Sequence, residues 1–209
     1  MKRILIIALV LINTVGVLAQ TFEGKIVYQN TVKSKVKEMT DQQWIALLGT
    51  EQEYIIKKGN YKSISNGTMF QWQLYLNNEN KIYNKLAASN SAFWLDASQA
   101  AETITKIEVV KNAAEVIGYS CDMVVITTPT ATEKYYYNIK FAVDPSLFVN
   151  HKYGNWADFV AKSKSLPLKI VIDNSQFILQ SEAKSIKASK VPDDVFELPA
   201  GMQITKSPY

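Results

Sequence analysis

The chain has 209 residues, of which 47% are hydrophobic and 20% are charged, a composition that suits one domain with a sizeable core. The net charge is +4 and the basic residues are scattered, so there is no electrostatic case for a nucleic-acid partner. One cysteine and one histidine exclude an internal disulfide framework and any zinc site that needs several such ligands.

The first residues have the features of a secretory signal peptide. Lys2 and Arg3 precede an apolar run from Ile4 to Ile12, and a small-residue cleavage site ends at Ala19. We therefore predict a signal peptide over residues 1–19 and a periplasmic or secreted protein, the alternative being an uncleaved N-terminal anchor. The mature chain, residues 20–209, has 190 residues, a charge of +2 and no further stretch that could span a membrane.

Alternation of apolar and polar residues dominates the mature chain and predicts half-buried strands. In residues 71–77, Trp72, Leu74 and Leu76 fall on one face, with glutamines opposite. Similar alternation occurs over residues 22–30, 167–173 and 177–187. Asn66-Gly67, between two such runs, favours a hairpin with a type I′ turn, in which both residues have positive φ.

Three short segments predict helical turns rather than long crossover helices. Thr40 can cap a helix that ends at Gly49, Asn155 can cap a helix over residues 156–163, and Asp96 can cap a brief turn. Without crossover helices, a parallel βαβ fold is disfavoured. We predict a mainly β fold, in which a curved antiparallel sheet of nine to eleven strands forms a half-barrel with short helices on its concave face.

The single cysteine lies in one of the predicted strands. Alternation places Cys121 on the same face as Ile117, Tyr119, Met123 and Val125. Free cysteine is often buried, and apolar surroundings raise its pKa, so we expect a sheltered and unreactive thiol.

Motifs for catalysis and for cofactors are missing from the sequence. A cysteine nucleophile or a serine triad would have to use His151, and nothing in the sequence brings it to a partner. There is no nucleophile elbow, phosphate-binding glycine motif or calcium loop, so we expect no enzyme, no metal and no cofactor. A carboxylate-pair hydrolase remains an alternative, and it requires that at least two of Asp122, Glu133, Asp144 and Asp158 converge.

Aromatic residues are abundant: the chain has 11 Tyr, 8 Phe and 4 Trp. Most of them are explained by core packing in a large sheet. A subset is expected to line an apolar pocket, since ligand pockets are mostly apolar with few polar anchors. The candidate lining residues are Trp72, Leu74, Leu76, Tyr119, Met123 and Trp156.

Two stretches, EVIGYSCDMVVI and VPDDVFELPAGMQ, resemble a family of exported bacterial proteins of unknown function. EKYYYNIKFAVDP and LPLKIVI lie between them, and the resemblance covers most of the mature chain. That family is similar to the lipoprotein-carrier (LolA-like) half-barrel, which implies a carrier-like shape for residues 20–209 without implying lipoprotein transport. The residues that carry the resemblance are Gly118, Tyr119, Cys121, Pro167, Phe196, Pro199 and Gly201.

These observations favour a non-enzymatic exported protein that binds a lipid, acyl chain or other apolar ligand in the cavity of a curved sheet. Burial of the ligand's hydrocarbon would supply about 0.8 kcal/mol per CH₂. A structural or interaction module of the cell envelope, with a filled core and an envelope protein as partner, is the alternative. We expect a monomer.

Overall fold

The computed structural model describes residues 21–100 and 102–207, in which twelve strands form one curved, open sheet. The predicted signal peptide, residues 1–19, lies outside the described residues. The order of strands across the sheet is β12-β6-β5-β4-β3-β2-β1-β11-β10-β9-β8-β7. Consecutive strands pair as antiparallel neighbours in two runs, β1 to β6 and β7 to β11, which join where β1 pairs with β11.

The first run comprises β1 (Gly24–Ser34), β2 (Glu51–Lys57), β3 (Asn60–Ser65), β4 (Phe70–Leu76), β5 (Lys81–Leu86) and β6 (Ala92–Asp96). The second comprises β7 (Lys106–Val116), β8 (Tyr119–Thr127), β9 (Ala131–Ala142), β10 (Ser165–Asn174) and β11 (Phe177–Ala188). The last strand, β12 (Ile204–Lys206), pairs in parallel with β6. The mainly β, curved-sheet prediction is confirmed, whereas the predicted strand number is too low and β12 makes the sheet mixed.

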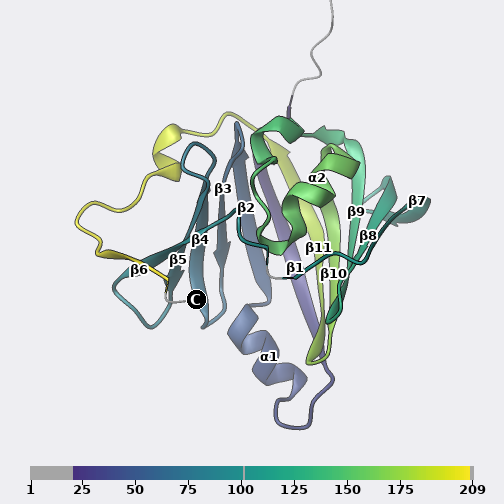
Figure 1. Ribbon diagram of the computed structural model, residues 1–209, viewed down its shortest axis with the longest axis horizontal. Coiled ribbons are helices and arrows are strands. Elements are labelled where there is room, and N and C mark those ends of the chain that lie inside the picture. The colour runs from purple at the N-terminus through teal and green to yellow at the C-terminus, as the bar shows by residue number, and fades with distance from the viewer. Residues whose placement is uncertain (1–20, 101, 208–209) are drawn as a thin grey trace, which may run out of the picture.

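The helices are short, as predicted. α1 (Asp41–Leu48) has a full capping box, in which the Thr40 side chain accepts from the Gln43 backbone and the Gln43 side chain accepts in return. α2 (Trp156–Ser163) packs against β8, β9 and β10, and Figure 1 shows it on the concave side of the sheet. Residues 21–100 and 102–207 also contain three 3₁₀ helices: η1 (Pro145–Phe148), η2 (Tyr153–Asn155) and η3 (Asp193–Phe196). Asp96 ends β6 and its side chain accepts from the backbone of Ser98.

The predicted type I′ turn at Asn66-Gly67 is wrong, although the hairpin of β3 and β4 exists. Neither residue has positive φ, and residues 66–69 form a longer loop against the end of α1. A Cβ on Gly67 would lie 2.4 Å from the carbonyl oxygen of Leu47, so glycine is required here for close approach. Paired positive φ values occur instead in two-residue turns, at Lys58-Gly59 and Ile117-Gly118.

Cys121 is fully buried, as predicted, but the alternation predicted around it does not hold along β8. The buried residues are Cys121, Val124 and Ile126, so the pattern shifts by one residue and Met123 is only half-buried. Opposite this point β7 has a bulge between Val110 and Ala114, and bulges increase local twist. Ile117 lies in the β7–β8 turn and is exposed.

Two hydrophobic clusters cover the two faces of the sheet. The larger one includes Phe159 and Val160 of α2 together with inward-facing residues of β1 to β3 and β8 to β10. The smaller one joins Leu74 and Tyr83 of the sheet to Val191 and Phe196. The C-terminal segment, residues 190–207, thus covers the opposite face and ends as β12 beside β6 (Figure 1).

Across the described part of the chain, no helix has the length and apolar character needed to cross a membrane.

Candidate functional site

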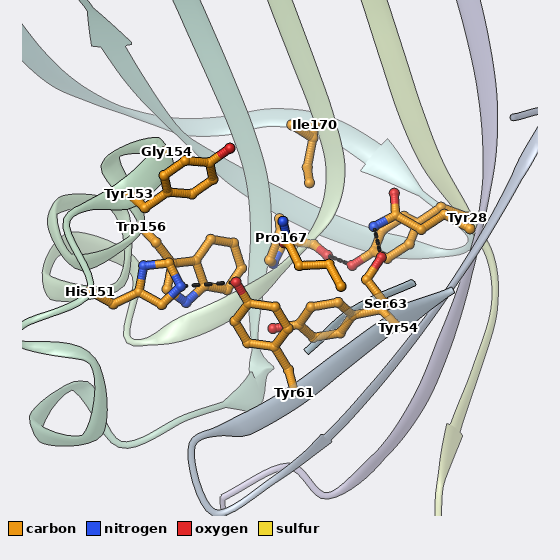
Figure 2. Close-up of a pocket in the computed structure, with 12 residues that line it drawn as sticks. Tyr28, Tyr54, Tyr61, Ser63, His151, Tyr153, Gly154, Trp156, Pro167 and Ile170 are labelled. Carbon is orange, nitrogen blue, oxygen red and sulfur yellow. Dashed lines mark hydrogen bonds between the residues drawn. The ribbon is translucent and has the colours of Figure 1, made fainter. Parts of the chain in front are cut away.

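A hollow of about 170 Å³ lies between strands β1–β4 and β10 of the sheet and the segment that contains His151, η2 and the start of α2 (Figure 2). The wall combines tyrosine, tryptophan and histidine rings with a few amide and hydroxyl groups. The lining residues are Tyr28, Gln52, Tyr54, Tyr61, Ser63, Gln73, His151, Tyr153, Gly154, Trp156, Pro167 and Ile170.

A stack of tyrosines from successive short strands runs from one wall of the hollow into the core beside it. Tyr54 of β2, Tyr61 of β3 and Tyr75 of β4 face inward, with ring centroids 5.1 and 5.3 Å apart. The cross-strand register sets the stack, because Tyr61 lies directly opposite Tyr75. Trp156 of α2 approaches from the other side, about equally far from Tyr54 and Tyr61, at 6.3 and 6.2 Å.

His151 lies at the base of this stack and is 1% exposed. Its Nε2 shares a hydrogen bond of 2.9 Å with the Tyr61 hydroxyl, and its ring centroid is 4.3 Å from that of Tyr75. Burial lowers the pKa of His151 to about 4, so the imidazole is neutral at physiological pH.

Several buried polar atoms in and around the hollow have no partner among the described residues. They include the Tyr54 hydroxyl, the indole nitrogen of Trp156 and Nδ1 of His151. Burial raises the pKa of Tyr54 well above its usual value, so this hydroxyl keeps its proton. Tyr28 differs, because its hydroxyl donates to the carbonyl oxygen of Pro167 at 2.7 Å.

A second hollow, of about 180 Å³, adjoins the first and shares Gln52, Ser63 and Gln73 with it. Its remaining lining residues are Asn30, Leu48, Ser65, Phe70, Trp72 and Leu179. Asn30 is 6% exposed, and its Nδ2 donates to the carbonyl oxygen of Gly49. The Oδ1 of Asn30 has no partner in the described structure.

Of the six candidate lining residues from the sequence, Trp156 alone lines the first hollow. Leu74, Leu76 and Trp72 pack with the C-terminal segment in the smaller cluster, although Trp72 also borders the second hollow. Tyr119 packs edge-on against Phe141, and Met123 is half-buried opposite Val110 and Tyr136. The structure therefore brings Trp156 together with residues that the sequence analysis did not select.

The missed residues are chiefly Tyr54, Tyr61 and His151. Alternation along β2 places Tyr54 and Ile56 on one face, and the Lys58-Gly59 turn fixes the register that brings Tyr61 opposite Ile56. This signal is present in the sequence. No pattern in the sequence places His151 beside them, because it follows η1 in a loop.

The four carboxylates of the hydrolase alternative have separate partners. Asp122 pairs with Lys111 at the sheet edge, whereas Glu133 accepts from Tyr135 and Asn155. Asp144 caps η1, and Asp158 lies in the first turn of α2. None of the four lines either hollow, and no cluster of three or more His, Cys, Asp or Glu suited to a metal occurs in residues 21–100 and 102–207.

The fold is similar to part of two solved structures. The structure of PNGF-II in a C2 crystal form matches 90% of this chain with a TM-score of 0.50 and 15% identity. The P21 form of PNGF-II matches 90% of this chain with a TM-score of 0.51 and 13% identity. The chain spans 31% and 32% of the length of those two chains, so the likeness concerns the fold alone.

No protein-family model and no curated protein sequence matches the chain. The resemblance to the lipoprotein-carrier half-barrel therefore stays a prediction.

Proposed function

We propose that the chain is an exported, non-enzymatic protein that binds a small ligand in the aromatic hollow on the concave face of its sheet. The observation that carries this proposal is the group of unpartnered polar atoms in and around the hollow, above all the Tyr54 hydroxyl and the Trp156 indole nitrogen. Buried polar groups in native proteins are almost always hydrogen-bonded, so unpartnered ones beside a hollow indicate a missing partner.

The size of the hollow constrains what it encloses. A cavity of about 150 Å³ accommodates a molecule the size of benzene. At about 170 Å³, the first hollow therefore fits one ring or a short branch of a ligand rather than a whole acyl chain. A lipid would leave most of its hydrocarbon outside, which weakens the original expectation of a buried acyl chain.

The chemistry of the wall favours binding over catalysis. Tyr61 and His151 share their hydrogen bond in the buried base of the hollow, and none of the lining residues is an aspartate, glutamate or cysteine. The buried imidazole has a pKa of about 4. General bases work best with a pKa near the operating pH, so His151 is poorly suited to that role near neutrality.

Native mass spectrometry of the purified protein tests whether a small molecule co-purifies. Binding of the neutral fluorescent probe N-phenyl-1-naphthylamine gives a second readout. Ile170→Trp adds an indole to the wall of the hollow and should weaken probe binding at least about tenfold. Ile139→Trp, at a position 65% exposed, is the matched control and should leave binding unchanged. Equal binding by both variants would remove the hollow as the site.

A further inference from the structure

The two adjoining hollows have complementary hydrogen-bonding needs. In the first, the Tyr54 hydroxyl and the Trp156 indole N–H are donors without an acceptor. In the second, Oδ1 of Asn30 is an acceptor without a donor. A ligand that reaches across both must accept at one end and donate at the other. Hydroxyl groups do both, whereas esters, ethers and aromatic rings do not donate.

The rings of the first hollow favour a ligand with a flat face of C–H groups. The faces of aromatic rings carry partial negative charge and attract the partly positive hydrogens of a neighbouring group. Tyr54, Tyr61 and Trp156 present such rings around one ring-sized space (Figure 2). A pyranose ring has a flat C–H face and a rim of hydroxyl groups, and it matches this space in both respects.

The hollows also indicate that the ligand is neutral. The lining residues of the two hollows include no lysine, arginine, aspartate or glutamate. A charged ligand would lose its hydration here without meeting an opposite charge, which is strongly unfavourable.

Between the two hollows lie the shared side chains Gln52, Ser63 and Gln73. Gln52 donates to the Ser63 hydroxyl at 2.7 Å, and Gln73 donates to Asn84 at 2.9 Å. The oxygen of each amide can act as a hydrogen-bond acceptor. Polar groups between two ring-sized spaces fit the linkage between two sugar units.

We propose that the two hollows are adjacent subsites for a neutral saccharide of at least two units. One ring lies against Tyr54 and Trp156, and the next donates a hydroxyl hydrogen to Asn30. This inference rests on the proposed function, and it adds the class of ligand.

The test is calorimetric titration of the purified protein with neutral disaccharides: cellobiose, maltose, lactose and N,N′-diacetylchitobiose. The matching monosaccharides, glucuronic acid and decanoic acid serve as comparison ligands. At least one disaccharide should bind at least about ten times more tightly than its monosaccharide, a difference of about 1.4 kcal/mol, while glucuronic and decanoic acids bind more weakly still.

Two variants separate binding from folding. Tyr54→Phe removes a hydroxyl that has no partner in the free protein, so it should weaken disaccharide binding about tenfold without lowering the urea midpoint of unfolding. Tyr83 packs on the face of the sheet opposite the hollows, and its hydroxyl donates a hydrogen bond to Glu79. Tyr83→Phe removes this hydroxyl. It should lower the urea midpoint and leave disaccharide affinity unchanged, the reverse pattern.

Three outcomes would overturn the saccharide inference. In the first, Tyr54→Phe binds the disaccharide as tightly as the unaltered protein. In the second, decanoic or glucuronic acid binds more tightly than every disaccharide. In the third, no disaccharide binds at concentrations up to roughly 10 mM, ten times a dissociation constant of about 1 mM. If the neutral fluorescent probe still binds in an Ile170-dependent manner, the proposed function survives and only the saccharide inference fails.

Discussion

The buried histidine should make the protein less stable in mild acid. His151 has a pKa of about 4 in the folded protein, because burial disfavours its charged form, against an ordinary value of 6.5. Well above pH 6.5 the imidazole is neutral in both states and contributes no pH dependence. Below pH 6.5 the unfolded chain takes up a proton that the folded protein refuses, so the free energy of unfolding falls as the pH falls.

The magnitude follows from the two pKa values. Each pKa unit corresponds to 1.36 kcal/mol, and between pH 7 and pH 5 the unfolded histidine becomes almost fully protonated while the folded one stays neutral. Over this interval His151 should therefore remove about 2 kcal/mol of stability. The lowered pKa values of Asp41, Glu79 and Asp122 matter mainly at lower pH, since those carboxylates remain largely ionised at pH 5 in both states.

Urea unfolding at pH 7 and at pH 5 measures the effect, with His151→Gln as the matched variant. The glutamine amide can still bond to the Tyr61 hydroxyl but does not titrate. The change in the free energy of unfolding between pH 7 and pH 5 is measured for both proteins, and the value for the variant is subtracted from that for the unaltered protein. The subtraction cancels the contributions of other titrating groups. One of them is Glu133, whose pKa is raised by burial and which therefore stabilises the folded protein as the pH falls. The same pH dependence in both proteins would refute the reasoning.

Three further predictions concern the fold. Cys121 should react with a thiol reagent at least about a hundred times more slowly in the native protein than in urea, because burial shelters it and raises its pKa; equal rates would contradict its placement. Phe159→Ala should lower the free energy of unfolding by about 3–5 kcal/mol in urea titrations, against less than about 0.5 kcal/mol for Val149→Ala, which is exposed. Gly24→Ala should be more destabilising than Gly118→Ala in the same assay. Both glycines have positive φ, but a Cβ on Gly24 would lie 2.1 Å from the Lys187 carbonyl oxygen, whereas Gly118 faces open space; a larger loss at Gly118 would show that this contact does not matter.

Local signals in the sequence were sufficient for much of the fold. Alternation predicted β1, β4, β8, β10 and β11, and Thr40 with Gln43 formed the capping box that begins α1. The burial of Cys121 was also predicted correctly, although the buried face of β8 shifts by one residue after it. These features depend on residues close together in the chain, so a local pattern contains the information that determines them.

The location of the hollow could not be predicted in the same way. Alternation along β4 separates Leu74 from Gln73 and Tyr75, but it does not say which face becomes concave. The C-terminal segment decides this, because Val191 and Phe196 cover Leu74 from more than 100 residues away in the chain. Likewise the β6–β12 pairing joins Ala92 to Ile204, and three residues give too short an alternation to detect.

The two ends of the sheet differ in how they meet solvent. At one end β12 covers part of β6, whereas at the other β7 presents an edge that no other described strand pairs with. An extended peptide that added itself to β7 would meet the distortion between Val110 and Ala114, where Asn112 has positive φ. The continuous row of hydrogen-bonding groups on which fibrils grow is therefore interrupted near its middle, which should help the protein resist aggregation through this edge despite the exposed Val109 and Val110.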